Sequence, residues 1–279
     1  TSGFGYAKIN GRFFTTIGQP LPPPDDVLAF PGESDDKKHI NLYAYSYLNL
    51  IKGLTFTLGA SGDFVDTDNG EFKSKRQFNP KFGVIWNPLV DTTIRAAAFR
   101  SLKRTLITDQ TLEPTQVAGF NQFFDDLNGT ESWRYGVAVD QKFTREIYGG
   151  LEVSGRSLQI PLSELNVDGS VALKDNDGRE QLSRTYLYWT PFPWVALRAE
   201  YSFEHLTTEG VSLLPARLST HRVPLGLNFF HPSGLSALVQ PTYYHQAGKF
   251  NLKVEGSTRT GSDDFWTLDL ALNYCLPMR

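Results

Sequence analysis

Most of the chain follows one pattern, in which apolar and polar residues alternate with a period of two. In residues 195–204 apolar side chains occupy every second position, from Val195 to Phe203, with mostly polar or small residues between them. Residues 266–274 repeat the pattern from Trp266 to Tyr274. This alternation is typical of a β-strand whose two faces meet different surroundings. No segment sustains a helical period, so the sequence predicts an all-β fold.

The same alternation predicts about twelve strands. Most are longer than the roughly 5–6 residues typical of globular proteins. They suit the about 9–11 residues that a tilted strand needs to cross a bilayer. The predicted strands are 4–16, 38–50, 54–66, 74–87, 91–104, 131–142, 146–158, 181–190, 194–206, 218–230, 235–247 and 263–275.

Short and long connections alternate between these strands. Short turns are expected at 51–53, 88–90, 143–145, 191–193 and 232–234. The long polar segments are 17–37, 67–73, 105–130, 159–180, 207–217 and 248–262. Outer-membrane barrels have short periplasmic turns and long extracellular loops. The pattern therefore predicts a transmembrane antiparallel up-and-down β-barrel in preference to a soluble sandwich, in which the aromatic residues would fill a core.

The composition agrees with this prediction. The 279 residues have a formal net charge of -3 and include one cysteine, Cys275. Mean hydropathy is -0.30, and no apolar run reaches the roughly 18 residues of a membrane helix. A barrel whose strands alternate apolar and polar residues, and whose loops are polar, has a mean hydropathy of this size. The near-neutral charge argues against nucleic-acid binding, and a single cysteine excludes an intramolecular disulfide.

Charged residues within the strands are expected to face the lumen, because a charge facing lipid at the membrane centre costs about 2–4 kcal/mol. We expect them to form a cross-strand ion-pair network, with a ligand path or plug-contact surface as the functional alternative. The predicted lumen charges are Lys81, Arg95, Arg134, Asp140, Glu152, Arg156, Arg198, Glu200, Glu204 and Asp269.

Residues 78–88 read Phe-Asn-Pro-Lys-Phe-Gly-Val-Ile-Trp-Asn-Pro, and Thr-Thr-Ile-Arg-Ala follows after a turn. This segment resembles the barrel of TonB-dependent outer-membrane receptors. Residues 110–116 resemble the Leu-x-Pro-Glu stretch of those receptors in altered form, and residues 131–136 resemble the strand that follows it. Residues 264–269 resemble the third-from-last strand. The chain is also similar to a subgroup in which the barrel follows tetratricopeptide repeats.

The resemblance implies a solute receptor whose complete barrel has about 22 strands and carries a plug domain and a TonB box. We expect residues 1–279 to be a single partial barrel domain, with no plug domain and no signal peptide. The implied location is the outer membrane of a Gram-negative bacterium, in contact with lipid and lipopolysaccharide. The other implied partners are an unknown small solute and, through regions absent from this sequence, a TonB-type energy transducer. No cofactor and no nucleic acid is expected.

Two groups are candidates for ligand contact. The loops 105–130 and 159–180 are the longest, and a contact patch is predicted in the first of them. It comprises Phe120, Phe123, Phe124, Asp125 and Asp126. A basic rim of Arg100, Lys103 and Arg104 is predicted at the outer end of one strand, where it would attract an anionic ligand or lipopolysaccharide. Solvated surface charge is the plainer interpretation of the rim.

Signals for metal binding and catalysis are weak. Residues 66–71 and 175–178 contain Asp, Asn and Gly, but neither has the spacing of a calcium loop, so no metal site is predicted. His231 and Ser233 lie in a predicted short turn without an Asn partner. No phosphate-binding loop or nucleophile motif is present, and we expect no enzyme activity.

Three functions are compatible with the sequence. The first is uptake or passage of a solute through a receptor-like barrel. The second is a barrel that anchors a tetratricopeptide-repeat scaffold or exports a polymer. The third is a complete twelve-strand barrel, such as an autotransporter translocator or a barrel enzyme, although the last strand lacks the terminal aromatic residue expected there.

Overall fold

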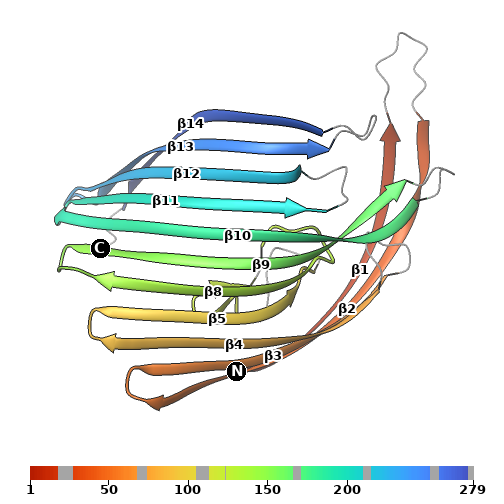
Figure 1. Cartoon of the computed structure of the whole chain (residues 1–279), viewed down its shortest axis with the longest axis horizontal. Helices are drawn as coiled ribbons and strands as arrows, with labels where there is room; N and C mark the ends of the chain where they lie inside the picture. The colour runs from red at the N-terminus through yellow and green to blue at the C-terminus, as the bar shows by residue number, and fades with distance from the viewer. Residues whose placement is uncertain are drawn as a thin grey trace, which may run out of the picture.

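The computed structural model describes residues 1–17, 28–67, 74–104, 113–122, 124–165, 171–209, 215–251 and 258–275. Twelve strands form a single antiparallel sheet in chain order, interrupted only by a small hairpin, β6–β7, between β5 and β8 (Figure 1). None of the described segments is a helix long and apolar enough to cross a membrane. The all-β, up-and-down arrangement agrees with the alternation in the sequence.

The strands are long throughout the sheet. Their bounds are β1 Ser2–Ile17, β2 Leu28–Ile51, β3 Leu54–Thr67, β4 Lys75–Leu89, β5 Thr92–Leu102, β6 Gln116–Val117, β7 Phe120–Asn121, β8 Glu131–Lys142, β9 Ile147–Leu165, β10 Val171–Phe192, β11 Val195–Thr208, β12 Pro215–Phe230, β13 Leu235–Asn251 and β14 Thr258–Tyr274.

All the short turns lie at one end of the sheet, at the left in Figure 1. Gly53 and Gly234 have φ values of 79° and 89° there, a backbone conformation that glycine adopts without steric cost. A Cβ on Gly234 would also approach the Cys275 carbonyl oxygen to 2.7 Å. Each predicted short turn is present, within one or two residues of its predicted bounds.

The predicted long loops 17–37, 159–180 and 248–262 are too long. Residues 159–180 are largely strand, because β9 and β10 pair as far as Leu165 and Val171. β1 and β2 pair as far as Ile17 and Leu28, and β13 and β14 as far as Asn251 and Thr258. Residues 174–178 read Lys-Asp-Asn-Asp-Gly, a polar composition typical of turns, so hydrophobic alternation does not mark this part of the ladder as strand. The prediction of a loop is therefore wrong for residues 159–165 and 171–180, and a ligand contact by this segment stays a prediction.

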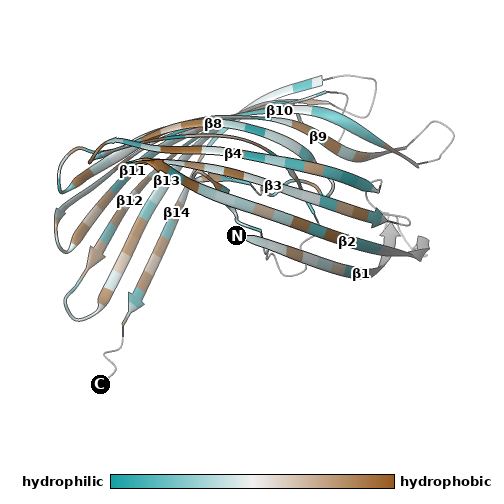
Figure 2. Cartoon of the chain, turned by 90° about the horizontal axis from the view of Figure 1, so that it is seen from below, coloured by the Kyte–Doolittle hydropathy of each residue, from teal (hydrophilic) through white to brown (hydrophobic). Residues whose placement is uncertain are grey.

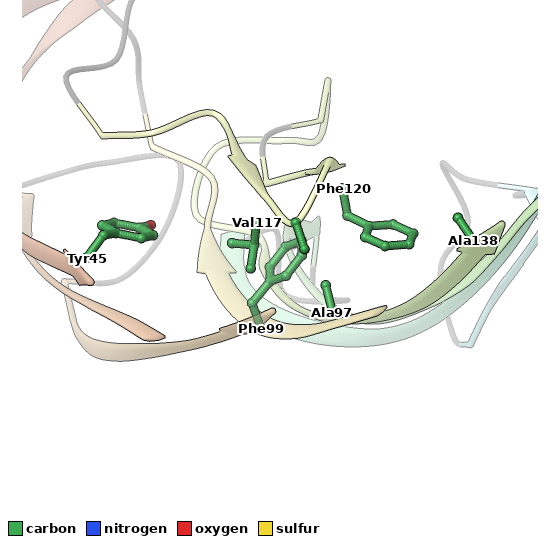
Figure 3. Close-up of a cluster of buried hydrophobic side chains, with 7 residues drawn as sticks. Tyr45, Ala97, Phe99, Val117, Phe120 and Ala138 are labelled. Carbon is green, nitrogen blue, oxygen red and sulfur yellow. The ribbon is translucent and has the colours of Figure 1, made fainter. Parts of the chain in front are cut away.

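The two faces of the sheet differ in polarity. The outward face carries large exposed apolar side chains, including Phe82, Val137, Leu227 and Leu270. Charged and amide side chains, such as Lys81 and Asn79, are buried on the inward face. The sheet is curved (Figure 2), and the buried apolar cluster of Figure 3 lies on its concave side. The concave, inward face is therefore the polar one.

The outward apolar band crosses the sheet diagonally. Register pairs connect Val223 on β12 to Leu54 on β3 through one residue on each intervening strand. On β12 the apolar band ends at Val223, because the next outward residue is His221. On β3 it continues through apolar or small outward residues to Phe64, ten residues beyond Leu54. Ten residues span about 34 Å, and the seven intervening strand steps also span about 34 Å. The strands therefore tilt by about 45° to the band, as in membrane barrels.

We expect Leu227→Arg to destabilise the protein by about 2–4 kcal/mol, the cost of an arginine on the lipid face near the membrane centre. Gln240→Arg on the neighbouring strand β13 is the matched control, because Gln240 lies on the wet inward face. Urea unfolding from phospholipid vesicles measures both costs. Equal destabilisation by the two variants would contradict the assignment of the faces.

Candidate functional site: the concave face and its inner hairpin

The segment between β5 and β8 folds back onto the concave face. Within it, β6 and β7 pair Gln116 with Asn121 and Val117 with Phe120, which leaves Ala118 and Gly119 as the turn. Both turn residues have positive φ, 48° and 84°. Two-residue hairpins favour this geometry because it matches the twist of the strands. We call residues 113–122 the inner hairpin.

The sheet beneath the inner hairpin is made of small residues. Val117 and Phe120 are fully buried against Ala97 on β5 and Ala138 on β8 (Figure 3). A Cβ on Gly83 of β4 would come within 2.9 Å of Val117 Cγ1, and one on Gly136 of β8 would overlap the Phe120 ring. The absence of side chains at the two glycines therefore lets the hairpin contact the wall.

The inner hairpin lies level with the middle of the apolar band. Gly83, which lies directly beneath the hairpin, is between Phe82 and Val84, within the outward apolar run of β4 from Phe78 to Trp86. Gly136 lies between Tyr135 and Val137, which also face outward. The hairpin thus narrows the concave space at mid-membrane height.

Glu113 anchors the start of the hairpin. Its carboxylate lies 3.0 Å from Arg104 Nη2 and 3.5 Å from Lys81 Nζ, and it accepts a 2.6 Å hydrogen bond from Tyr45 Oη. Gln122, at the other end of the hairpin, donates to Tyr45 Oη at 2.9 Å. Lys81 is 1% exposed and Glu113 is 3% exposed. Two cations and a carboxylate are thus desolvated together, so each depends on the others for compensation.

A second polar group surrounds Asp63 on β3. Its carboxylate accepts hydrogen bonds from Asn41 at 3.0 Å and Asn79 at 2.8 Å, and lies 2.9 Å from His39 Nε2. Arg104 Nη1 lies 3.5 Å from the same carboxylate. Arg104 therefore joins the Asp63 group to the Glu113 anchor.

Arginines on β5, β8 and β9 face the aromatic residues of the folded-back segment. The Arg134 guanidinium lies 5.5 Å from the Phe120 ring centre and 4.8 Å from that of Phe124, and Arg156 lies 3.8 Å from Phe124. Arg95 is 5.3 Å from Phe120. Desolvated cation–π contacts of this kind contribute about 2 kcal/mol or more each.

Carboxylates neutralise these arginines. Arg95 pairs with Asp140 at 2.7 Å and Arg134 with Glu152 at 3.3 Å. Arg156 pairs with Asp126 at 2.5 Å and with Glu180 at 3.0 Å. Further along the wall, Glu200 accepts from Arg184 at 2.8 Å and from Arg198 at 2.7 Å.

A groove of about 360 Å³ lies between the inner hairpin and the wall of β10–β12. Its charged lining is formed by three arginines and three glutamates from five strands, and Asn121 and Phe124 line it on the hairpin side. We call it the inner groove; the six charged residues are Arg134, Glu152, Arg184, Glu200, Glu204 and Arg222.

The ten predicted lumen charges all lie on the inward face by strand register. Eight of them make the ion pairs described above. Glu204 borders the inner groove, and Asp269 lies on the exposed strand β14, where Gln240 donates to it at 3.4 Å. The structure thus brings eight of them into ion-paired groups on the inward face and leaves Asp269 at its margin.

The predicted contact patch has a different location from that expected. Phe120 is part of the inner hairpin and is fully buried, Phe124 lies against Arg156, and Asp126 pairs with that arginine. Only Asp125 is exposed, and Phe123 lies outside the described residues. For Phe120, Phe124 and Asp126 the placement in an outward-reaching loop is wrong, because cation–π and ionic contacts hold them against the wall.

The basic rim is also divided. Arg100 stays near the strand end and pairs with Glu131 at 2.6 Å, while Lys103 donates to the Phe124 carbonyl at 3.0 Å. Arg104 is buried between Glu113 and Asp63. Its assignment to a solvent-facing rim is wrong, because the chain turns inward after Leu102.

The weaker chemical signals gain no support. Residues 175–178 lie in β10, and most of residues 66–71 fall outside the described residues. The described part of the chain contains no cluster of His, Cys, Asp and Glu suited to a metal ion. His231 Nδ1 lies 2.8 Å from Ser233 Oγ in an exposed turn and also accepts from the Ser233 backbone N–H, which is a local turn interaction.

Sequence reasoning missed Tyr45, Asp63, Asn79, Glu113 and Gln122. The signal for Asp63 and Asn79 was present, since each occupies the inward register of its strand. Glu113 and Gln122 lie in an irregular segment, where no periodicity marks the side of the sheet that a residue contacts.

Comparison with known proteins gives a likeness of fold. No protein-family model and no curated protein matches the sequence. The solved ferric-catecholate import receptor Fiu from E. coli K12 is similar with a TM-score of 0.63 and 12% identity, over 99% of this chain and 45% of that chain. The ferripyoverdine receptor of the outer membrane of Pseudomonas aeruginosa gives 0.57 and 14%, over 88% and 34%. The FpvAI–pyocin S2 complex gives 0.59 and 12%, also over 88% and 34%.

The chain shares its fold with part of the barrel of these outer-membrane receptors. At these identities the likeness concerns the fold alone, and the chain spans less than half the length of the receptors that it matches. These structures give no support to the tetratricopeptide-associated subgroup.

We expect Gly136→Ala to displace the inner hairpin, because the added methyl group overlaps the Phe120 ring. Overpacking of this kind costs about 1–3 kcal/mol, so maleimide labelling of an Ala118→Cys reporter, in a Cys275→Ser background, should accelerate about tenfold or more. Gly155→Ala on β9 is the control, since its nearest atom would be the Glu180 carbonyl oxygen at 3.7 Å. Equal labelling rates in the two variants would contradict the packing of the hairpin.

Glu113→Gln is expected to destabilise the protein by about 3–5 kcal/mol, because it leaves buried Lys81 and Arg104 short of negative charge. Asp125→Asn removes the same charge from an exposed position and should change stability by no more than about 0.5 kcal/mol. Both values come from urea unfolding monitored by tryptophan fluorescence. A cost for Glu113→Gln as small as that of Asp125→Asn would overturn the anchor role.

Proposed function

We propose that the chain is part of the wall of an outer-membrane receptor barrel that takes up a solute into a Gram-negative cell. The observation that carries the proposal is a sheet with an exposed apolar outward face, whose concave polar side holds an inner hairpin beside a charged groove. The fold likeness to outer-membrane receptors supports it.

The open sheet supports a larger barrel. Among the described residues, β1 pairs only with β2 and β14 only with β13. An unpaired strand edge in hydrocarbon costs several kcal/mol for each exposed N–H or C=O group. We therefore propose that residues 1–279 form one partial barrel domain within a closed barrel of about 22 strands, as in other large outer-membrane transporters. The open edges also disfavour a closed twelve-strand barrel.

The inner groove, with three arginines and three glutamates in its lining, favours a polar solute that offers both anionic oxygens and hydrogen-bond donors. Arg134, Arg184 and Arg222 line it, and guanidinium groups bind carboxylate or catecholate oxygens in paired hydrogen bonds. Two of the receptors with this fold are named for ferric catecholate and ferripyoverdine. We propose ferric chelates as the solute class and a TonB-type transducer as the energy source.

Uptake of ⁵⁵Fe-labelled ferric catecholate and ferripyoverdine, with and without the gene, tests the proposal. Arg184→Gln with Arg222→Gln should raise the half-saturating concentration roughly tenfold or more, because each charged hydrogen bond contributes about 1.5–3 kcal/mol. The control, Lys142→Gln with Arg145→Gln, alters exposed residues near a short turn.

Inactivation of the TonB-type transducer should abolish the same uptake. Uptake that persists without the transducer would indicate a passive pore instead. Unchanged iron uptake after loss of the gene would reject ferric chelates as the solute.

A further inference from the structure

A second groove, of about 720 Å³, crosses the opposite, outward face of the sheet near the long-connection end. Its lining includes Arg100, Trp133, Ser157, Arg179, Thr207 and Arg217. Strand register places these six on one row, each paired with the next across β5, β8, β9, β10, β11 and β12. We call it the outer groove; a solute in the concave space would not meet it.

The outer groove begins at the apolar band and leads away from it. On β8, Trp133 stacks on Tyr135 with ring centres 6.0 Å apart, and Tyr135 continues the exposed apolar row of Val137 and Val139. On β12, Arg217 lies six residues beyond Val223, about 20 Å along the strand. Because the strands tilt, a row of paired residues rises relative to the membrane plane. The groove therefore extends from the lipid border into the outer headgroup layer.

Cations and hydroxyls line the row itself. Arg179 and Arg217 are exposed and lie two strand steps apart, about 10 Å. Ser157 lies between Arg179 and Trp133, and Thr207 lies between the two arginines. Guanidinium groups bind phosphate oxygens in pairs. Arg100 is held by Glu131 at 2.6 Å, which leaves Arg179 and Arg217 as the principal phosphate contacts.

Carboxylates border the outer groove on the side away from the apolar band. The next row of register partners, further from the apolar band, consists of Glu131, Asp177 and, between them, the amide Gln159. Glu209 extends this row, and its backbone N–H donates to the Asp177 backbone carbonyl at 3.0 Å. Carboxylates repel phosphate but accept hydrogen bonds from sugar hydroxyls. A fitting ligand thus presents phosphate to the arginine row and hydroxyl groups to the acidic row.

We propose that the outer groove binds the headgroup of a phosphorylated glycolipid of the outer leaflet, with its acyl chains along Val137 and Val153. Two arginines about 10 Å apart suit a headgroup with more than one phosphate. A common phospholipid has one phosphate and no sugar to reach the acidic row. This inference rests on the outer-membrane location in the proposed function.

Native mass spectrometry of the protein purified from outer membranes and delipidated in detergent tests the proposal. The probes are a bisphosphorylated glycolipid, the same lipid after dephosphorylation, phosphatidylglycerol and inorganic phosphate. Arg179→Gln with Arg217→Gln should weaken binding of the bisphosphorylated glycolipid about thirtyfold, since each cation near an anionic lipid contributes roughly fivefold. Lys142→Gln with Arg145→Gln, the same charge loss at the other end of the sheet, should leave it unchanged.

A second pair of substitutions identifies the source of the phosphate. Asp177→Asn with Glu209→Gln should weaken glycolipid binding but strengthen phosphatidylglycerol binding, because it removes both the sugar acceptors and the repulsion. Equal binding of the dephosphorylated lipid, equal binding of phosphatidylglycerol, or binding of inorganic phosphate alone would each overturn the proposal. A protein absent from the outer-membrane fraction would instead refute the proposed function.

Discussion

The bilayer constrains this structure because it offers no hydrogen-bond partner to the backbone. Each strand must pair with a neighbour on either side, so the chain forms one continuous sheet in which every long strand follows its predecessor. The same environment makes a charge on the outward face costly. Polar side chains then accumulate on the concave face, where Lys81, Asn79 and Arg134 are buried. The network there follows from the exclusion of charge from the other side.

The position of the inner hairpin depends on the charged residues of the concave face. Arg95, Arg134 and Arg156 are paired with carboxylates, yet each also lies near an aromatic ring of the folded-back segment. Lifting the segment would return Phe120 and Val117 to water and uncover the arginines. The hairpin therefore acts as part of the wall, and the inner groove lies beside it.

The sequence predicts the membrane-spanning parts of the strands well, because lipid on one side and water on the other impose the alternation. It fails beyond the membrane. The outer halves of β9 and β10 pair over residues 159–165 and 171–180, but residues 174–178 read Lys-Asp-Asn-Asp-Gly, a polar composition typical of turns. Because successive residues of a strand point to opposite faces, the sequence also places the predicted lumen charges on the inward face. Glu113 and Arg104 belong to irregular chain, whose direction is set by tertiary contacts and not by local pattern.

Strand tilt connects the two faces. A row of register partners is perpendicular to the strands, so it crosses the membrane plane at an angle of about 45°. On the outward face this geometry carries one row from Trp133, beside the apolar band, to Arg217, well beyond it. On the inward face it means that the charges of β3 and β4 and those of β11 and β12 lie at different heights even where they share a row. A solute that moves along the inner wall would therefore meet these charged groups in sequence, with the hairpin at the middle of the path.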